Sequence, residues 1–291
     1  MSMLLSILIA GLVTGSIYAL VASGLSLVWG TVGVFNFAQG ALLMLGSYSA
    51  FYFGTNVWGQ KGLFIAIPSA LLISGCLGVL LYKTVVKPFI GLKTGELAVI
   101  MATLAVGTFL ENGAQQFFGP TFRKLPPIAN GKVVINYNPV SAQQGIIMVV
   151  APIVLIGFAL FLKKAKFGFA VRAVSQNRDT ALLNGIPVER IYIFVFFTSA
   201  LLAGLAGVLF GGQYFIRPDM GGQLMLQAFI VVLFGGLGSL IGTVVSAYVI
   251  GFITAACNIY VGLFWTPVAL FIFLFVAILI KPSGLMAPSK Q

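Results

Sequence analysis

The sequence predicts an all-α, polytopic membrane helix bundle, and its composition and apolar segment lengths lead to this prediction. Of its 291 residues, 60% are hydrophobic and 7% are charged, and the mean hydropathy is +1.10. Because soluble globular chains carry about 25% charged residues, so few charges cannot cover a surface that faces water. Lipid must therefore be the solvent for much of this surface.

Apolar segments of about 20 residues, the length that crosses a bilayer, recur along the whole chain. One of them, 223–258, is too long for a single helix, and Gly235-Gly236-Leu237-Gly238-Ser239 predicts a break within it. Segment 31–54 has a similar interruption near Gly33 and Asn36. We therefore expect about eight or nine spans, some broken or re-entrant, with the irregular backbone buried in protein. The segments are 4–29, 31–54, 62–82, 95–118, 145–163, 191–211, 223–258 and 264–280.

The basic residues orient the bundle. Most of them lie in the loop 83–94, in the connection 163–190 and after residue 280. The positive-inside rule makes this face cytoplasmic, together with the C-terminus, and makes 119–143 an external loop. The basic residues form no continuous patch with aromatic residues, so nucleic acid is not an expected partner. The remaining basic residues, on the external face, are Lys61, Arg123, Lys124, Lys132 and Arg217.

No catalytic constellation can be recognised in the sequence. Histidine is absent, and no Gly-x-Ser-x-Gly elbow or close pair of carboxylates occurs. The stretch Gly91-Leu92-Lys93-Thr94 imitates a phosphate-binding loop but lacks its upstream glycine and the glycine before lysine. We therefore expect neither an enzyme nor a metal or cofactor site, and any ATP that drives this protein must be hydrolysed by another subunit.

One carboxylate lies well inside an apolar segment. Glu111 is followed by Asn112 and precedes two glutamines within the segment 95–118. Ionisable groups inside a membrane often line a pathway, so these residues could be a polar lining near the outer mouth. Alternatively, Glu111 lies at the interfacial end of its helix and reaches water there.

The connection 164–190 contains the most informative stretch, 168–187. It is too polar to span, yet Val171, Val174, Ala181 and Leu182 recur at helical spacing. Gly185 followed by a proline two residues later predicts the end of a helix. A short cytoplasmic helix of this kind could dock a partner protein or lie on anionic lipid headgroups. The residues alone leave both possibilities open.

At this point the sequence resembles a known family, the permeases of branched-chain amino acid ABC importers of the H type. The resemblance is carried by 168–187, by the run 11–48 with its Asn36-Phe37-Ala38-Gln39-Gly40, and by 203–209 and 233–239. It extends over essentially the whole chain in the same order. In the coupling region of these permeases, the matching residues here are Gly168, Arg172, Ala173, Asn177, Ala181, Gly185 and Ile186.

The resemblance implies a single permease domain over 1–291 in the bacterial inner membrane. It implies a second homologous permease, two cytoplasmic ATPase subunits and an extracytoplasmic substrate-binding protein as partners. Branched-chain amino acids are then the expected substrate. Urea or short amides are an alternative cargo, and a stand-alone facilitator of small neutral solutes or a membrane scaffold is an alternative function.

The resemblance also implies where function resides. The helix at 170–184 would fit a groove on an ATPase, and the breaks at 36–40 and 235–239 would border the pathway, although ordinary helix kinks would also explain them. The expected coupling residues are Gly168, Arg172, Ala173, Val174, Asn177, Arg178, Asp179, Ala181, Leu182 and Gly185. The expected pathway residues are Asn36, Gln39, Gly40, Glu111, Asn112, Gly235, Gly236 and Gly238.

Overall fold

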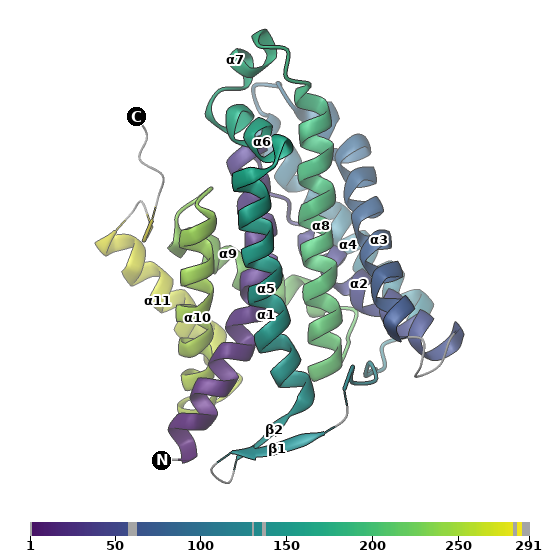
Figure 1. Cartoon of the computed structure of the whole chain (residues 1–291), viewed down its shortest axis with the longest axis vertical. Helices are drawn as coiled ribbons and strands as arrows, with labels where there is room; N and C mark the ends of the chain where they lie inside the picture. The colour runs from purple at the N-terminus through teal and green to yellow at the C-terminus, as the bar shows by residue number, and fades with distance from the viewer. Residues whose placement is uncertain (1, 58–62, 130, 136–137, 282–283, 287–291) are drawn as a thin grey trace.

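The computed structural model describes residues 2–57, 63–129, 131–135, 138–281 and 284–286. Most helices follow the long axis of the molecule, and a short antiparallel hairpin lies at one end (Figure 1). The elements are α1 (Ser2–Val32), α2 (Gln39–Tyr52), η1 (Phe53–Val57), α3 (Leu63–Leu81), η3 (Tyr82–Val86), η4 (Lys87–Phe89), α4 (Gly95–Phe118), β1 (Lys132–Ile135), β2 (Asn138–Ser141), α5 (Ala142–Lys164), α6 (Lys166–Gln176), α7 (Arg178–Leu183), α8 (Val188–Gln213), α9 (Met220–Gly235), α10 (Leu240–Tyr260) and α11 (Thr266–Ile280).

The prediction of a polytopic helix bundle is confirmed. Six helices in the described part of the chain are long and apolar enough to cross a bilayer. Two shorter apolar helices, α9 and α11, have 16 and 15 residues, which is short of the about 20 that a full crossing needs. The 14 residues of α2 continue without a break into the five of η1. The expected number of about eight or nine spans therefore stays a prediction.

The centre of the bundle is α1, which packs against α10, α8, α9, α5 and α2. Small residues allow this close packing, because no hydrophobic effect drives helices together in lipid. A Cβ on Gly251 of α10 would lie only 2.6 Å from the Cα of Gly15 in α1. The two backbones are therefore in direct contact, and a larger side chain at either position would force them apart.

The two ends of the bundle differ in character (Figure 1). At one end, α6 and α7 lie beside the end of α1 and the η4–α4 connection, and Lys87 forms an ion pair with Glu189 at the start of α8. The other end carries the β1–β2 hairpin and an antiparallel bridge between Arg123 and Ile216. The described basic residues of 83–94 and 163–190 thus share one end, as predicted. Lys61 and Lys290 lie outside the described residues.

The predicted break at Gly235–Ser239 is present between α9 and α10. Gly236 and Gly238 have φ of +98° and +81°, a backbone conformation that favours glycine. Ser239 begins α10 by accepting a hydrogen bond of 3.2 Å from the Gly242 N–H. The last carbonyls of α9 accept from the backbone of Leu285 and Met286. The turn is therefore covered by protein, as irregular backbone in a membrane must be.

Candidate functional site: the meeting point of α2 and α9

The second predicted interruption, near Asn36, places the start of α2 inside the bundle. After α1 ends, residues 33–38 fold back, and Gln39 lies beside Ser199 in the middle of α8. The Gln39 Nε2 donates to the Ser199 carbonyl at 2.9 Å, and the Ser199 hydroxyl donates to Gln39 Oε1 at 3.1 Å. Both side chains are buried. The first turn of α2 is therefore held inside the bundle, beside the middle of α8.

Side chains satisfy the irregular backbone that leads into α2. The Phe37 N–H donates to Thr103 Oγ1 of α4 at 3.2 Å, and the Ala38 N–H donates to Asn36 Oδ1 at 3.2 Å. A buried N–H without a partner is costly, so these bonds fix the fold-back in place. The Asn36 Nδ2 is buried without a hydrogen-bond partner among the described residues.

The short helix α9 begins at the same place. A Cβ on Gly40 would lie 2.2 Å from the Gly221 carbonyl oxygen, and one on Gly221 would lie 2.7 Å from the Gly40 oxygen. The first turns of α2 and α9 therefore touch through bare backbone. Each helix start carries N–H groups without intrahelical partners and the positive end of the helix dipole.

Glu111 supplies negative charge at this meeting point. Its Oε1 would lie only 2.9 Å from a Cβ on Gly221 and 3.6 Å from one on Gly222. An acidic group at a helix N-terminus is stabilised by the dipole and by the free N–H groups. Glu111 therefore contacts the start of α9 and not only water at the end of its own helix.

Of the expected pathway residues, the structure brings Asn36, Gln39, Gly40 and Glu111 together around Gly221. Asn112 is exposed, and its Nδ2 donates to Thr108 of its own helix at 2.8 Å. The glycines at 235, 236 and 238 lie elsewhere, in the turn beside Gly30 near the α6–α7 end. Sequence reasoning missed Thr103, Ser199 and Gly221. The Pro218-Asp219 pair before Gly221 is a helix-start signal that could have located the last of them.

A cavity with a volume of about 410 Å³ opens near the hairpin end, between α1, α8, α9, α10 and α11. We call it the external cavity because this end is predicted to be external. Its wall is mainly apolar and aromatic, and Arg217 is the one charged side chain among the described residues that line it. A pocket of this size is in the range that holds small molecules.

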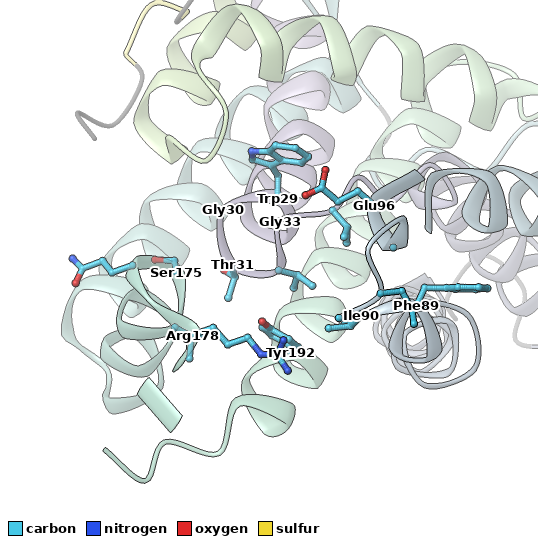
Figure 2. Close-up of a pocket in the computed structure, with 17 residues that line it drawn as sticks. Trp29, Gly30, Thr31, Gly33, Phe89, Ile90, Glu96, Ser175, Arg178 and Tyr192 are labelled. Atoms are coloured by element: carbon cyan, nitrogen blue, oxygen red, sulfur yellow. The ribbon is translucent and has the colours of Figure 1, made fainter. Parts of the chain in front are cut away.

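A second cavity, of about 460 Å³, lies at the opposite end between α1, α4, α6 and α8. Figure 2 shows Arg178 of α7 reaching toward Tyr192 of α8, whereas Glu96 of α4 lies across the cavity near Trp29. The cavity lies between the ends of α6 and α7 on one side and the end of α1 and the η4–α4 connection on the other. A displacement of α6 and α7 relative to the bundle can therefore be accommodated here.

The predicted single helix over 170–184 is wrong in one respect, because it is divided in two at Asn177. This residue is extended, with φ of −155°, and its Oδ1 accepts from the Thr180 N–H at 2.9 Å as the N-cap of α7. Asparagine favours such caps over helix interiors because its short side chain competes for backbone groups. The predicted stop is confirmed: Gly185 has φ of +76°, and the Ile186 N–H donates to the Ala181 carbonyl at 3.0 Å.

Arg172 ties α6 to the end of α5. Its guanidinium donates to the carbonyls of Leu162 and Lys163 and lies 4.5 Å from the centre of the Phe169 ring. These carbonyls are among the last in α5 and have no partner within that helix. A Cβ on Gly168 would lie 2.1 Å from the Leu162 oxygen, so the α5–α6 corner also requires glycine.

The apolar residues of this region divide into a buried and an exposed set. Val171, Val174 and Ala181 are buried against the bundle, and Val174 is only 3% exposed. Leu182 and Leu183 on α7 are 48% and 89% exposed. Val174 therefore holds α6 on the bundle, and the two leucines are the exposed apolar side chains of α7.

Replacing Asn177 with alanine is expected to loosen α7 without unfolding the bundle. The loss of an N-cap side chain costs about 1 kcal/mol, and this short helix has little else to stabilise it. Hydrogen exchange should rise over 178–184 and stay unchanged in α8. Asn177→Asp, which also caps, should restore protection. Equal exchange in Asn177→Ala and the original protein would contradict the capping role.

The comparisons with known proteins agree along the whole chain. The family described as "Branched-chain amino acid transport system / permease component" matches residues 7–280. The permease protein LivH of Escherichia coli K12 is 26% identical over 95% of this chain and 93% of its own length. BraD of Pseudomonas aeruginosa is 28% identical over 96% and 94%. Both are named as high-affinity branched-chain amino acid transport system permease proteins. A chain of the solved PsaBC complex from Streptococcus pneumoniae is similar with a TM-score of 0.48 and 16% identity, over 97% of this chain and 92% of its own.

Proposed function

This chain belongs to the family of permease components of branched-chain amino acid transport systems, and we propose that it forms the membrane pathway of an ATP-driven importer. Its family is one of membrane transport permeases, not of enzymes. The proposed cargo is branched-chain or other neutral amino acids, in keeping with the relatives named for that transport.

The observation that carries this proposal is the contact between the first turns of α2 and α9. Half-helices that begin at mid-depth are a feature of transporter binding sites, where their N-termini face polar parts of the substrate. Here Gly40 and Gly221 permit the contact, and the Glu111 carboxyl group lies against Gly221. A movement that separates the starts of α2 and α9 would expose polar backbone inside the membrane, which a pathway for polar solutes requires.

The proposed energy input is at the opposite end. The exposed Leu182 and Leu183, with Arg178 and Asp179 beside them, form a docking surface for an ATPase subunit on α7. Through Arg172, α6 is bound to the end of α5. A movement of the docked ATPase would therefore displace α5, and the cavity beside α6 leaves room for it (Figure 2). The chain itself holds no cofactor in this proposal, because partner subunits hydrolyse the ATP.

The assembly proposed around this chain follows the family. It has a second homologous permease, two ATPases on the face with most basic residues, and a substrate-binding protein on the hairpin face. By the positive-inside rule the α6–α7 end is cytoplasmic, together with the C-terminus. A bacterial inner membrane is the proposed location.

Reconstitution into liposomes tests this function. We expect leucine uptake only when the partner permease, both ATPases, ATP and the binding protein are all present. Without ATP on the side of the membrane that carries the ATPases, uptake should fall to the level measured with liposomes that contain no protein. Urea and acetamide, offered with the same components, should not be accumulated.

Two outcomes would contradict the proposal. Leucine flux down its gradient through this chain alone would favour a facilitator of small neutral solutes. Accumulation of urea or acetamide in place of leucine would favour the alternative cargo. The first outcome is not expected if an ATPase cycle must open the contact between α2 and α9.

A further inference from the structure

The external cavity has a single cationic group at its mouth. The side chain of Arg217 is held by Asp219, whose Oδ1 lies 3.5 Å from its Nε, and its Nη2 donates to Gln223 Oε1 at 3.2 Å. Its guanidinium carbon also lies 5.8 Å from the centre of the Phe122 ring. Arginine has five N–H donors in a planar fork, so these contacts orient the group and leave donors for a ligand.

The interior of the cavity combines polar groups with an apolar wall. Tyr18 and Thr254 line the cavity, and Thr266 Oγ1 lies 2.6 Å from Asn258 Oδ1. Tyr18 and Thr254 are both buried, being only 4% exposed each. Hydroxyl and amide oxygens thus lie inside the cavity, whereas Ile17 and Leu224 belong to its apolar wall.

The cavity is poorly matched to a lipid chain or a simple ion. An acyl chain would cover the Arg217 guanidinium and the side chains of Gln223 and Gln227 with hydrocarbon, which is costly for polar groups. An inorganic anion would pair with Arg217 but would not fill the apolar wall. A ligand with a carboxylate, an ammonium group and a small aliphatic side chain satisfies all three parts of the lining.

We propose that this external cavity binds the zwitterion of a neutral aliphatic amino acid, with its carboxylate on Arg217. The ammonium group meets the oxygens of Asn258 and Thr254, and the side chain lies against Ile17 and Leu224. The cavity borders the start of α9, through Met220 and Gln223, next to the contact between Gly40 and Gly221. The inference rests on the proposed function, because the cavity would be the first site in the membrane at which the cargo of that importer binds.

Binding of radiolabelled leucine to the purified transporter, with its partner subunits and without binding protein, tests the site. Arg217→Gln is expected to weaken leucine binding by about tenfold or more, the range for hydrogen bonds to a charged group. Leucinamide, which lacks the carboxylate, should bind wild type weakly. It should lose almost nothing further in Arg217→Gln, because the two changes remove the same interaction.

The controls separate this site from charge in general and from folding. Lys132→Gln removes an exposed cation from the same face and should leave leucine binding unchanged. The comparison of leucine with leucinamide on wild type needs no variant to fold. Equal affinities for the two ligands would overturn the proposal, and so would leucine binding that Arg217→Gln does not change. A lipid that co-purifies in the cavity and is not displaced by leucine would also overturn it.

The outcomes also distinguish this inference from the function beneath it. If reconstituted wild type accumulates leucine but Arg217→Gln binds it normally, the proposed function stands and the site is wrong. If wild type with all partners accumulates no leucine, the proposed function itself fails.

Discussion

Replacing Gly40 with alanine is expected to destabilise the folded protein by about 3 kcal/mol, the upper part of the range for overpacking a tight site. The new methyl carbon would lie 2.2 Å from the Gly221 carbonyl oxygen. This neighbour is main chain and cannot rotate away. α2 is held on its other side by the hydrogen bonds between Gln39 and Ser199. Either α2 or α9 must therefore move.

The measurement is the midpoint of thermal unfolding in detergent, followed by size-exclusion chromatography. Gly107→Ala is the matched control, because this glycine is also buried and faces the same fold-back. Its Cβ would lie 3.7 Å from the nearest atom, the Cα of Ala38, which is ordinary contact. Gly107→Ala should unfold at the original midpoint, and Gly40→Ala should unfold at a lower temperature. A common midpoint for both variants would show that the contact between α2 and α9 is not tight.

Much of this fold can be predicted from the sequence because lipid imposes a simple constraint. A segment of 20 apolar residues must form a helix, since no water satisfies its backbone. The break at Gly235–Ser239 was also predictable, because an apolar run of that length cannot be one helix. The distribution of basic residues correctly predicts that 83–94 and 163–190 lie at the same end of the bundle.

The depth at which a helix begins could not be predicted. Asn36 marks an interruption, but only tertiary contacts with Ser199 and Thr103 place the start of α2 inside the bundle. The contact between Gly40 and Gly221 joins positions far apart in the sequence, and a single sequence shows no such pairing. The approach of Glu111 to α9 depends on the same tertiary arrangement. The candidate site was therefore predicted in part, as a set of polar and glycine residues without their common partner.

The coupling region, 164–190, could also be predicted from the sequence only in part. Gly185 was a reliable stop signal because only glycine readily adopts its backbone angle. Asn177 was placed within one helix because the apolar spacing continues across it, although its capping side chain interrupts the backbone. Burial of Val174 and exposure of Leu183 also required the structure, since both are apolar residues in a short amphipathic stretch.

Reversing the charge of Arg172 is expected to abolish ATP-driven leucine uptake while the ATPases stay bound and continue to hydrolyse ATP. In Arg172→Glu, a carboxylate would face the carbonyls of Leu162 and Lys163, where the original guanidinium donates. Carboxylates are repelled by the negative end of a helix. α6 would therefore separate from α5, whereas the exposed leucines of α7 stay available for docking.

Leu183→Asp provides the contrast, because it changes the docking surface and leaves the α5–α6 corner intact. Its side chain is 89% exposed, so the bundle should fold normally, but the ATPases should no longer co-purify. Uptake is lost in both variants for different reasons, and the ratio of ATP hydrolysed to leucine transported separates them. Coupled uptake at the original ratio in Arg172→Glu would mean that the driving movement reaches the bundle by a route other than α5. Full ATPase binding by Leu183→Asp would place the docking surface away from α7.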